Sequence, residues 1–310
     1  MQRILVIAFV LMGFVNIYAQ SQDMYSQAIS YQFINKFISV PKPGMPISIL
    51  YYNSSIGITA DIEQDTLTTT IPQDFSIGVT TGLNIISSPS SFDSNDLLYG
   101  SAALAATGLT FLLDDEIRSS FNRNHSKALD NLGEIGHRYG DLYYMGGISA
   151  GVYVGGKIFG SEPVSVTGRM LLEGLFYAGA TTIILKTVLG RSRPYMNEGN
   201  TNLKWFQTTN DYNSMPSGHC TVAFAFSSVL AERLDNVYAS IFLYGLASTT
   251  IIQRMYSDNH WASDCLAGSV IGYIIGKAVV KFDDRQKDNN INLSAVYLPN
   301  GAGINLQYIF

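Results

Sequence analysis

Three short segments of this chain contain two histidines, two aspartates and four basic residues. The segments run from Lys186 to Pro194, from Pro216 to His219 and from Arg254 to Asp264. An imidazole can act as a nucleophile or as a general acid, and ammonium and guanidinium groups bind phosphate oxygens. Together these side chains predict a site that cleaves phosphate esters without a metal ion.

The third segment, QRMYSDNHWASDC, carries the nucleophile in this interpretation. His260 and Asp264 are four residues apart, a spacing that places two side chains on one face of a helix. A carboxylate in that position holds one imidazole tautomer and leaves the other ring nitrogen free to attack. Arg254, six residues before His260, offers a planar fork of donors that suits a phosphoryl group.

The other two segments supply donors. SMPSGHC predicts a helix start, with Ser214 or Ser217 as the cap and Pro216 in the first turn. The amides of a helix start bind anions, and Gly218 allows a close approach. His219 can protonate a leaving oxygen.

In KTVLGRSRPY, Lys186 and Arg193 are seven residues apart, close to two helical turns. We expect both side chains to point the same way, and we expect Pro194 to end the helix.

Taken together, K-x6-R-P, P-S-G-H and R-x5-H-x3-D resemble the three signature motifs of the type 2 phosphatidic acid phosphatase superfamily, over roughly residues 95 to 282. The resemblance implies that His260 attacks phosphorus to form a phosphohistidine, that Asp264 supports it, and that His219 is the general acid. It also implies a phosphate-binding set and no cofactor; the set is Lys186, Arg193, Ser217, Gly218 and Arg254. One departure is Gln253, where the family usually has serine; glutamine keeps a donor but changes its reach.

The resemblance leaves several functions open. The leading one is a phosphatase acting on a lipid phosphate or diphosphate. The alternatives are a soluble periplasmic acid phosphatase of broad specificity, a vanadium-dependent haloperoxidase, and a catalytically idle envelope scaffold. The chain's size and the lack of an evident halide-site motif disfavour the haloperoxidase, and the intact catalytic set disfavours the scaffold.

The composition is typical of an envelope protein. Only 14% of the 310 residues are charged, against about 25% in ordinary soluble domains. The net charge of −5 disfavours nucleic acid as a partner. Residues 1–20 resemble a secretory signal cleaved near Ala19 or Gln20, with a retained membrane helix as the alternative. We expect no lipid anchor, because no cysteine follows the apolar run.

The predicted fold is mainly α: a six-helix bundle in residues 96–282, with an N-terminal extension and a C-terminal β-hairpin. The expected helices are roughly 96–114, 141–159, 165–190, 217–234, 237–253 and 261–282. The polar connection between the first two should contain further helix. We expect loosely structured or short extended segments in residues 21–95, such as FSIGVTTGLNII, a charged linker at 283–290 and a hairpin at 291–310.

Membrane embedding is favoured over a soluble bundle, because several helices have few charges over nearly the spanning length of about 20 residues. A secretory signal and an exported site are incompatible with six crossings, so we expect a periplasmic active site and at least one helix that does not span. The family-like bundle could belong to the inner or the outer membrane. Cys220 and Cys265 each follow a site residue directly; free buried thiols are favoured over a disulfide.

Overall fold

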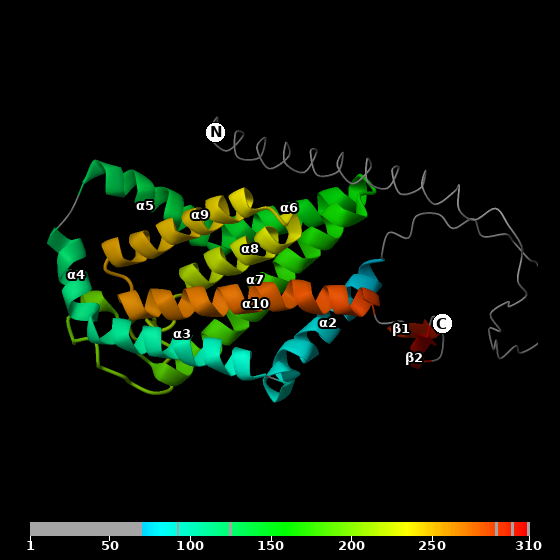
Figure 1. The fold of residues 1–310 in the computed structure, drawn as a ribbon, viewed down its shortest axis with the longest axis horizontal. Coiled ribbons are helices and arrows are strands. Elements are labelled where there is room, and N and C mark those ends of the chain that lie inside the picture. Colours follow the sequence, from blue (N-terminus) through cyan, green and yellow to red (C-terminus); the bar gives the residue numbers. More distant parts are fainter. Residues whose placement is uncertain (1–69, 92, 124–125, 289–290, 299–300, 309–310) are drawn as a thin grey trace, which may run out of the picture. The chain divides into compact units, whose positions relative to one another are not determined.

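The computed structural model describes residues 70–91, 93–123, 126–288, 291–298 and 301–308 (Figure 1). The predicted signal segment and most of the predicted N-terminal extension lie outside these residues. The described part is mainly helical, as predicted. Its helices are α2 (Ile71–Ser87), α3 (Ser94–Leu112), α4 (Asp114–Arg123), α5 (Lys127–Gly140), α6 (Leu142–Ile158), α7 (Glu162–Leu189), α8 (Gly218–Leu234), α9 (Val237–Tyr256) and α10 (Ala262–Asp288).

Short 3-10 turns and one strand pair complete the described elements. The turns are η1 (Ser88–Ser91), η2 (Pro194–Met196) and η3 (Asn210–Tyr212). The strands β1 (Ile291–Leu298) and β2 (Gly301–Tyr308) pair antiparallel, with Leu298 opposite Gly301 next to the turn.

Each of the six predicted ranges contains a helix, and α4 and α5 lie in the polar connection. The expectation of extended structure in FSIGVTTGLNII was wrong, because this segment lies inside α2. Thr70 and Gln73 form a capping box there, and a proline occupies the first turn. Both features start helices, and they outweigh the β-branched residues that suggested strands.

Helix α8 packs against α7, α9 and α10. A stripe of glycines on α10, Gly268, Gly272 and Gly276, faces the α8 backbone, and a Cβ at any of them would press on an α8 main-chain atom. The two helices therefore approach closely at their first turns, where the Ser217 amide donates to the Asp264 carbonyl at 2.9 Å. This contact brings the second and third sequence segments together.

A buried ionic cluster joins four helices near the start of α7. Arg169 of α7 pairs with Glu173 at 2.7 Å and with Asp283 of α10, and Lys157 of α6 pairs with Asp74 of α2 at 2.6 Å. Arg169 precedes the site residue Lys186 by about 25 Å of helix, at the usual rise per residue. The cluster therefore lies away from the site and fastens α2 to the bundle.

Two described helices are long and apolar enough to cross a membrane: Glu162–Leu189, which is α7, and Ala262–Asp283 within α10. The pair α3 and α4, bent by 60°, would be a third span if it crosses as one unit. Large apolar side chains on α7 and α10 are exposed, among them Phe176, Ile183, Ile184, Tyr273 and Ile274. These features support membrane association of the bundle.

Candidate active site

The end of α7 and the loop after it bring the first two cations to the site. The Lys186 Nζ donates to the carbonyl oxygens of Asn213 at 2.5 Å and Ser214 at 3.4 Å. Arg193 lies in the loop, where its Nε donates to the Asn210 carbonyl at 2.8 Å. The prediction that Lys186 and Arg193 share one helix was wrong.

Helix α7 ends at Leu189, before Pro194 could stop it, because Gly190 takes the left-handed conformation that closes a helix. The Gly190 φ is 56°, and a Cβ there would collide with the Lys204 carbonyl. The chain therefore turns back early, and Arg193 reaches the site from the loop.

The start of α8 presents donors to the same space. Ser217 is its N-cap, and the first helical hydrogen bond runs from the Thr221 amide to the Ser217 carbonyl at 3.0 Å. The amides of Gly218 and His219 therefore have no acceptor within the helix. The predicted position of Pro216 was the first turn of this helix; in the structure Pro216 lies before the N-cap residue Ser217. The site of a Gly218 Cβ is 3.7 Å from the Lys186 Cε, so Lys186 extends over this helix start.

His260 and Asp264 do not share a helix face, because α10 begins only at Ala262. The predicted pairing arises instead from the loop before α10. The His260 Nδ1 lies 3.7 Å from the Asp264 Oδ2, too far for a hydrogen bond. Catalytic hydrogen bonds are often long without substrate and shorten in the reacting complex. The arrangement thus holds Nδ1 toward the carboxylate and leaves Nε2 as the nitrogen that can attack.

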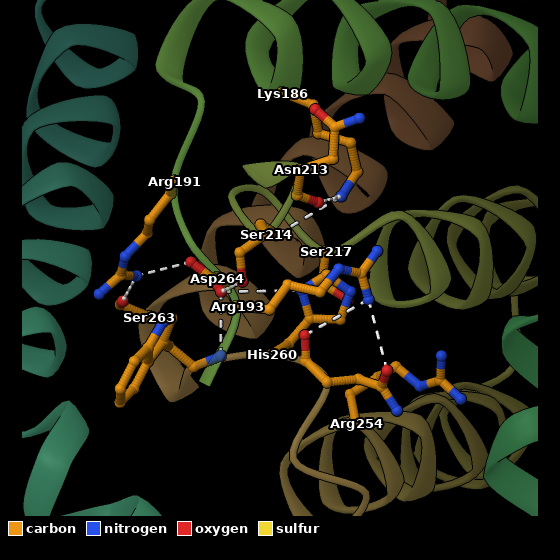
Figure 2. A network of polar contacts seen from close by, with 12 residues as sticks. Lys186, Arg191, Arg193, Asn213, Ser214, Ser217, Arg254, His260, Ser263 and Asp264 are labelled. Carbon is orange, nitrogen blue, oxygen red and sulfur yellow. Dashed lines mark hydrogen bonds and ion pairs between the residues drawn. The ribbon is translucent and has the colours of Figure 1, made fainter. Parts of the chain in front are cut away.

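Asp264 is held by groups that the sequence interpretation did not assign. Its Oδ1 accepts from the Arg191 Nη1 at 2.6 Å, and its Oδ2 accepts from the Ser214 hydroxyl at 2.5 Å and the Trp261 amide at 2.9 Å. Figure 2 shows these contacts around the carboxylate. The orientation of Asp264 is therefore fixed before any substrate binds.

Arg191 also contacts a second buried carboxylate. Its Nη2 donates to the Asp114 Oδ2 at 2.7 Å, and Arg191, Asp114 and Asp264 are completely buried. The guanidinium carbon lies 4.4 Å from the ring centroid of Phe111 and 5.4 Å from that of Trp261. Arg191 lies within the first sequence segment, between the two cations that were assigned, but Asp114 carries no local signal.

Arg254 and His219 share an unexpected neighbour, His137 of α5. The Arg254 Nη2 lies 2.9 Å from the His137 Nδ1, and the rings of His137 and His219 stack with centroids 5.4 Å apart. An arginine can only donate, so the His137 Nδ1 is the acceptor and its proton is on Nε2. Gln253, the departure from the family pattern, hydrogen-bonds the Arg254 Nε through its side-chain oxygen.

Burial and cations keep both site histidines neutral. Burial lowers the pKa of His260 to about 3, with Lys186 and Arg193 acting in the same direction against Asp264. Burial also lowers the pKa of His219 to about 3, and the charge of Arg254 adds to this effect. A neutral imidazole is the form that can attack phosphorus.

The structure brings all eight predicted residues to one place. Figure 2 shows Lys186, Arg193, Ser217, Arg254 and His260 around a common space, reached from α7, two loops, α8 and α9. Four buried polar atoms in this region have no hydrogen-bond partner in the part of the chain that the structure describes: the Asn213 Oδ1, the Ser217 Oγ, the His219 Nε2 and the His260 Nδ1. Of these atoms, the Ser217 Oγ and the His219 Nε2 can donate to an anionic ligand held by the neighbouring cations.

Both cysteines are buried free thiols. Cys220 and Cys265 lie in side-chain contact with each other. The contact agrees with the convergence of the second and third segments, and the structure has no disulfide between these two residues.

Residues 168–288 match the PAP2 superfamily model. This part of the chain is therefore similar to the PAP2 superfamily. The match covers all eight predicted site residues and confirms the resemblance to the type 2 phosphatidic acid phosphatases. His137 and Asp114 lie before the matched segment.

Among curated proteins, this chain is similar to the lipid A 1-phosphatase of Porphyromonas gingivalis. The two are 30% identical over 190 residues, which is 59% of this chain and 38% of the relative. The chain thus spans well under half the length of the relative it matches.

Two solved structures are also similar. The LpxE crystal structure from Aquifex aeolicus has a TM-score of 0.44 and 22% identity, over 55% of this chain and 95% of that one. The transmembrane PAP2-type phosphatidylglycerolphosphate phosphatase from Bacillus subtilis has a TM-score of 0.40 and 17% identity, over 69% of this chain and 98% of that one.

Proposed function

We propose that this chain is a metal-independent phosphatase of the cell envelope that acts on a lipid phosphate through a phosphohistidine. The observation that carries the proposal is the group of buried, unpartnered atoms beside three cations. Within the described residues, the Ser217 Oγ and the His219 Nε2 lack partners, and they lie next to Lys186, Arg193 and Arg254. A tetrahedral phosphoryl group would supply acceptors for these donors.

In the first step, the His260 Nε2 attacks phosphorus as the bond to the leaving oxygen breaks. His219 gives its proton to that oxygen, so the alcohol leaves neutral. Lys186, Arg193, Arg254 and the amides at the start of α8 neutralise the charge on the three equatorial oxygens. Asp264 stabilises the positive charge that develops on the His260 ring.

In the second step, His219 accepts a proton from water, whose oxygen attacks phosphorus and breaks the bond to His260. Because the free protein holds His219 neutral, a proton must arrive for the first step. The second ionisation of a phosphomonoester has a pKa of about 6, so the monoanion of the substrate carries this proton. The negative charge of the bound phosphate raises the pKa of His219, which can then accept it. The cycle returns His219 to its starting state once phosphate departs with its proton.

The proposed substrate is a lipid phosphate or diphosphate, such as phosphatidic acid, phosphatidylglycerol phosphate, undecaprenyl diphosphate or a phosphate of lipid A. Two observations support a lipid: the name of the Porphyromonas relative, and the exposed apolar side chains on two helices long enough to cross a bilayer. The test is phosphate release from a panel of lipid and water-soluble phosphates by the detergent-purified protein. Turnover of soluble esters alone would favour the acid phosphatase of broad specificity.

The nucleophile has its own test. His260→Ala should abolish turnover, whereas His219→Ala should slow both steps by about 10²- to 10⁴-fold and let a labelled phosphoenzyme accumulate. The label should be on His260. A phosphoryl group trapped on His219 would reverse the assignment.

We place the active site on the periplasmic side, with at least one of the six predicted helices not spanning. Thr201→Cys provides an exposed thiol in the loop at the site, and Glu162→Cys provides one at the opposite end of α7. The two native thiols are buried, so the background should be low. A membrane-impermeant reagent should label Thr201→Cys in intact cells and Glu162→Cys only after lysis; the reverse pattern would place the site in the cytoplasm.

A further inference from the structure

The loop between α7 and α8 carries two neighbouring aromatic side chains that the proposed chemistry does not use. Trp205 is 57% exposed and Phe206 is 73% exposed. The surrounding sequence, TNLKWFQTTN, is otherwise largely polar. Two adjacent large aromatic residues exposed on a polar loop are a candidate contact surface.

The backbone holds this pair against the end of α7. The Lys204 amide donates to the Gly190 carbonyl at 2.8 Å, and the Phe206 amide donates to the Val188 carbonyl at 3.4 Å. Phe206 has a φ of 59°, which is uncommon for a bulky residue and persists only where the surroundings impose it. The aromatic pair is thus held in place and does not hang from a flexible loop.

The same end of α7 is where a candidate membrane span stops and where the site residue Lys186 lies. The apolar stretch Glu162–Leu189 ends one residue before Gly190. Ile184, exposed on the last turns of α7, shares a helix face with Val188. Lys186, from the same turns, reaches the start of α8. The aromatic pair and the candidate site therefore lie at the same end of this helix.

We propose that Trp205 and Phe206 insert into the interface of the bilayer on the side where the phosphate pocket opens. Tryptophan accumulates at that depth because its ring has an apolar body and a polar N–H. The inserted pair would hold the mouth of the pocket at the headgroup layer, so that a lipid phosphate enters while its acyl chains stay in the bilayer. This inference rests on the proposed membrane location and not on the phosphohistidine chemistry.

Tryptophan fluorescence tests the insertion without any activity measurement. The chain has two tryptophans; Trp261 is only 1% exposed and its Nε1 donates to the Ser192 carbonyl at 2.9 Å. The difference between the unmodified chain and Trp205→Phe therefore isolates Trp205. In phosphatidylcholine vesicles, lipids brominated near the headgroup should quench this difference signal more strongly than lipids brominated near the chain end.

Two outcomes would overturn the proposal. Quenching of Trp205 by aqueous iodide and not by brominated lipid would place the loop in water. A signal shielded from both quenchers, and released when the protein is diluted in lipid, would show that a second copy of the chain covers the pair.

A kinetic comparison tests the consequence for the substrate. The double variant Trp205→Ala/Phe206→Ala should raise the KM for a lipid phosphate in vesicles by about tenfold, as expected from exposing part of one aromatic side chain. Turnover of a water-soluble phosphomonoester should stay unchanged. Phe159→Ala is the matched control, because Phe159 is 86% exposed and lies beyond α6, next to the opposite end of α7. If both variants raised the KM for the lipid phosphate equally, the proposal would be overturned. A chain that hydrolyses none of the phosphates would overturn the proposed function, and the fluorescence test of insertion would still apply.

Discussion

Replacing Arg191 should unfold this protein at a much lower temperature, because two buried carboxylates depend on this side chain. Arg191, Asp114 and Asp264 have no solvent exposure, and the guanidinium bridges the two acids at 2.7 and 2.6 Å. Arg191→Met keeps most of the volume but leaves both carboxylates without their cation. Breaking a buried pair in this way costs about 3–5 kcal/mol.

The expected change in melting temperature follows from this free energy. For a domain of this size, 1 kcal/mol corresponds to a shift of about 2–4 °C. Arg191→Met should therefore lower Tm by roughly 6–20 °C in detergent, as followed by thermal unfolding of the purified chain. Adding Asp114→Asn should recover part of the loss, because one of the two unpaired charges is removed while the amide oxygen still accepts from the Ser263 amide.

A matched control separates burial from ion pairing as such. Arg138 pairs with Glu134 at 2.5 Å, but both side chains are more than half exposed. Arg138→Met should cost less than ~1 kcal/mol, as exposed pairs usually do. If Arg191→Met shifted Tm no more than Arg138→Met, the reasoning from buried charge would be refuted.

Three further predictions concern the site. The pKa of His219 and of His260 in the folded protein lies near 3, below the ordinary value of 6.5, so the unfolded chain binds more protons between these pH values. The stability that these neutral histidines contribute should be fully present above pH 6.5 and be lost toward pH 3, as measured by Tm. His260→Gln should show a smaller decrease in Tm over this range than the unmodified chain, and a decrease equal to that of the unmodified chain would contradict the shift. Activity should survive EDTA and be inhibited by vanadate, which mimics the five-coordinate phosphoryl state, because the pocket cations are Lys186, Arg193 and Arg254; loss of activity in EDTA would exclude the proposed mechanism. His137→Ala should weaken vanadate inhibition by about tenfold, because Arg254 loses a hydrogen bond and one hydrogen bond to a charged group is worth about 1.5–3 kcal/mol. His137→Gln should restore part of the inhibition. Unchanged inhibition in both variants would show that His137 does not hold Arg254.

The sequence by itself determined most of the helices and named the residues of the candidate site. Apolar runs of helical length lie in the six predicted ranges, and each now contains a helix. The residue types of the three segments predicted a phosphate site, because ammonium and guanidinium groups bind phosphate oxygens and an imidazole beside a carboxylate can attack phosphorus. Thr70 and Gln73, which form the capping box of α2, are three residues apart in the sequence. This spacing is a local signal for a helix start.

Only the tertiary structure decided how these residues meet. Arg193 reaches the site from a loop, because Gly190 ends α7 early, and His260 faces Asp264 from outside α10. The bridge from Asp264 through Arg191 to Asp114, and the stacking of His137 on His219, join residues far apart in the chain. Local patterns specify turns and helix faces, whereas such contacts depend on how the helices pack, and here the glycine stripe of α10 sets that packing by letting α8 approach.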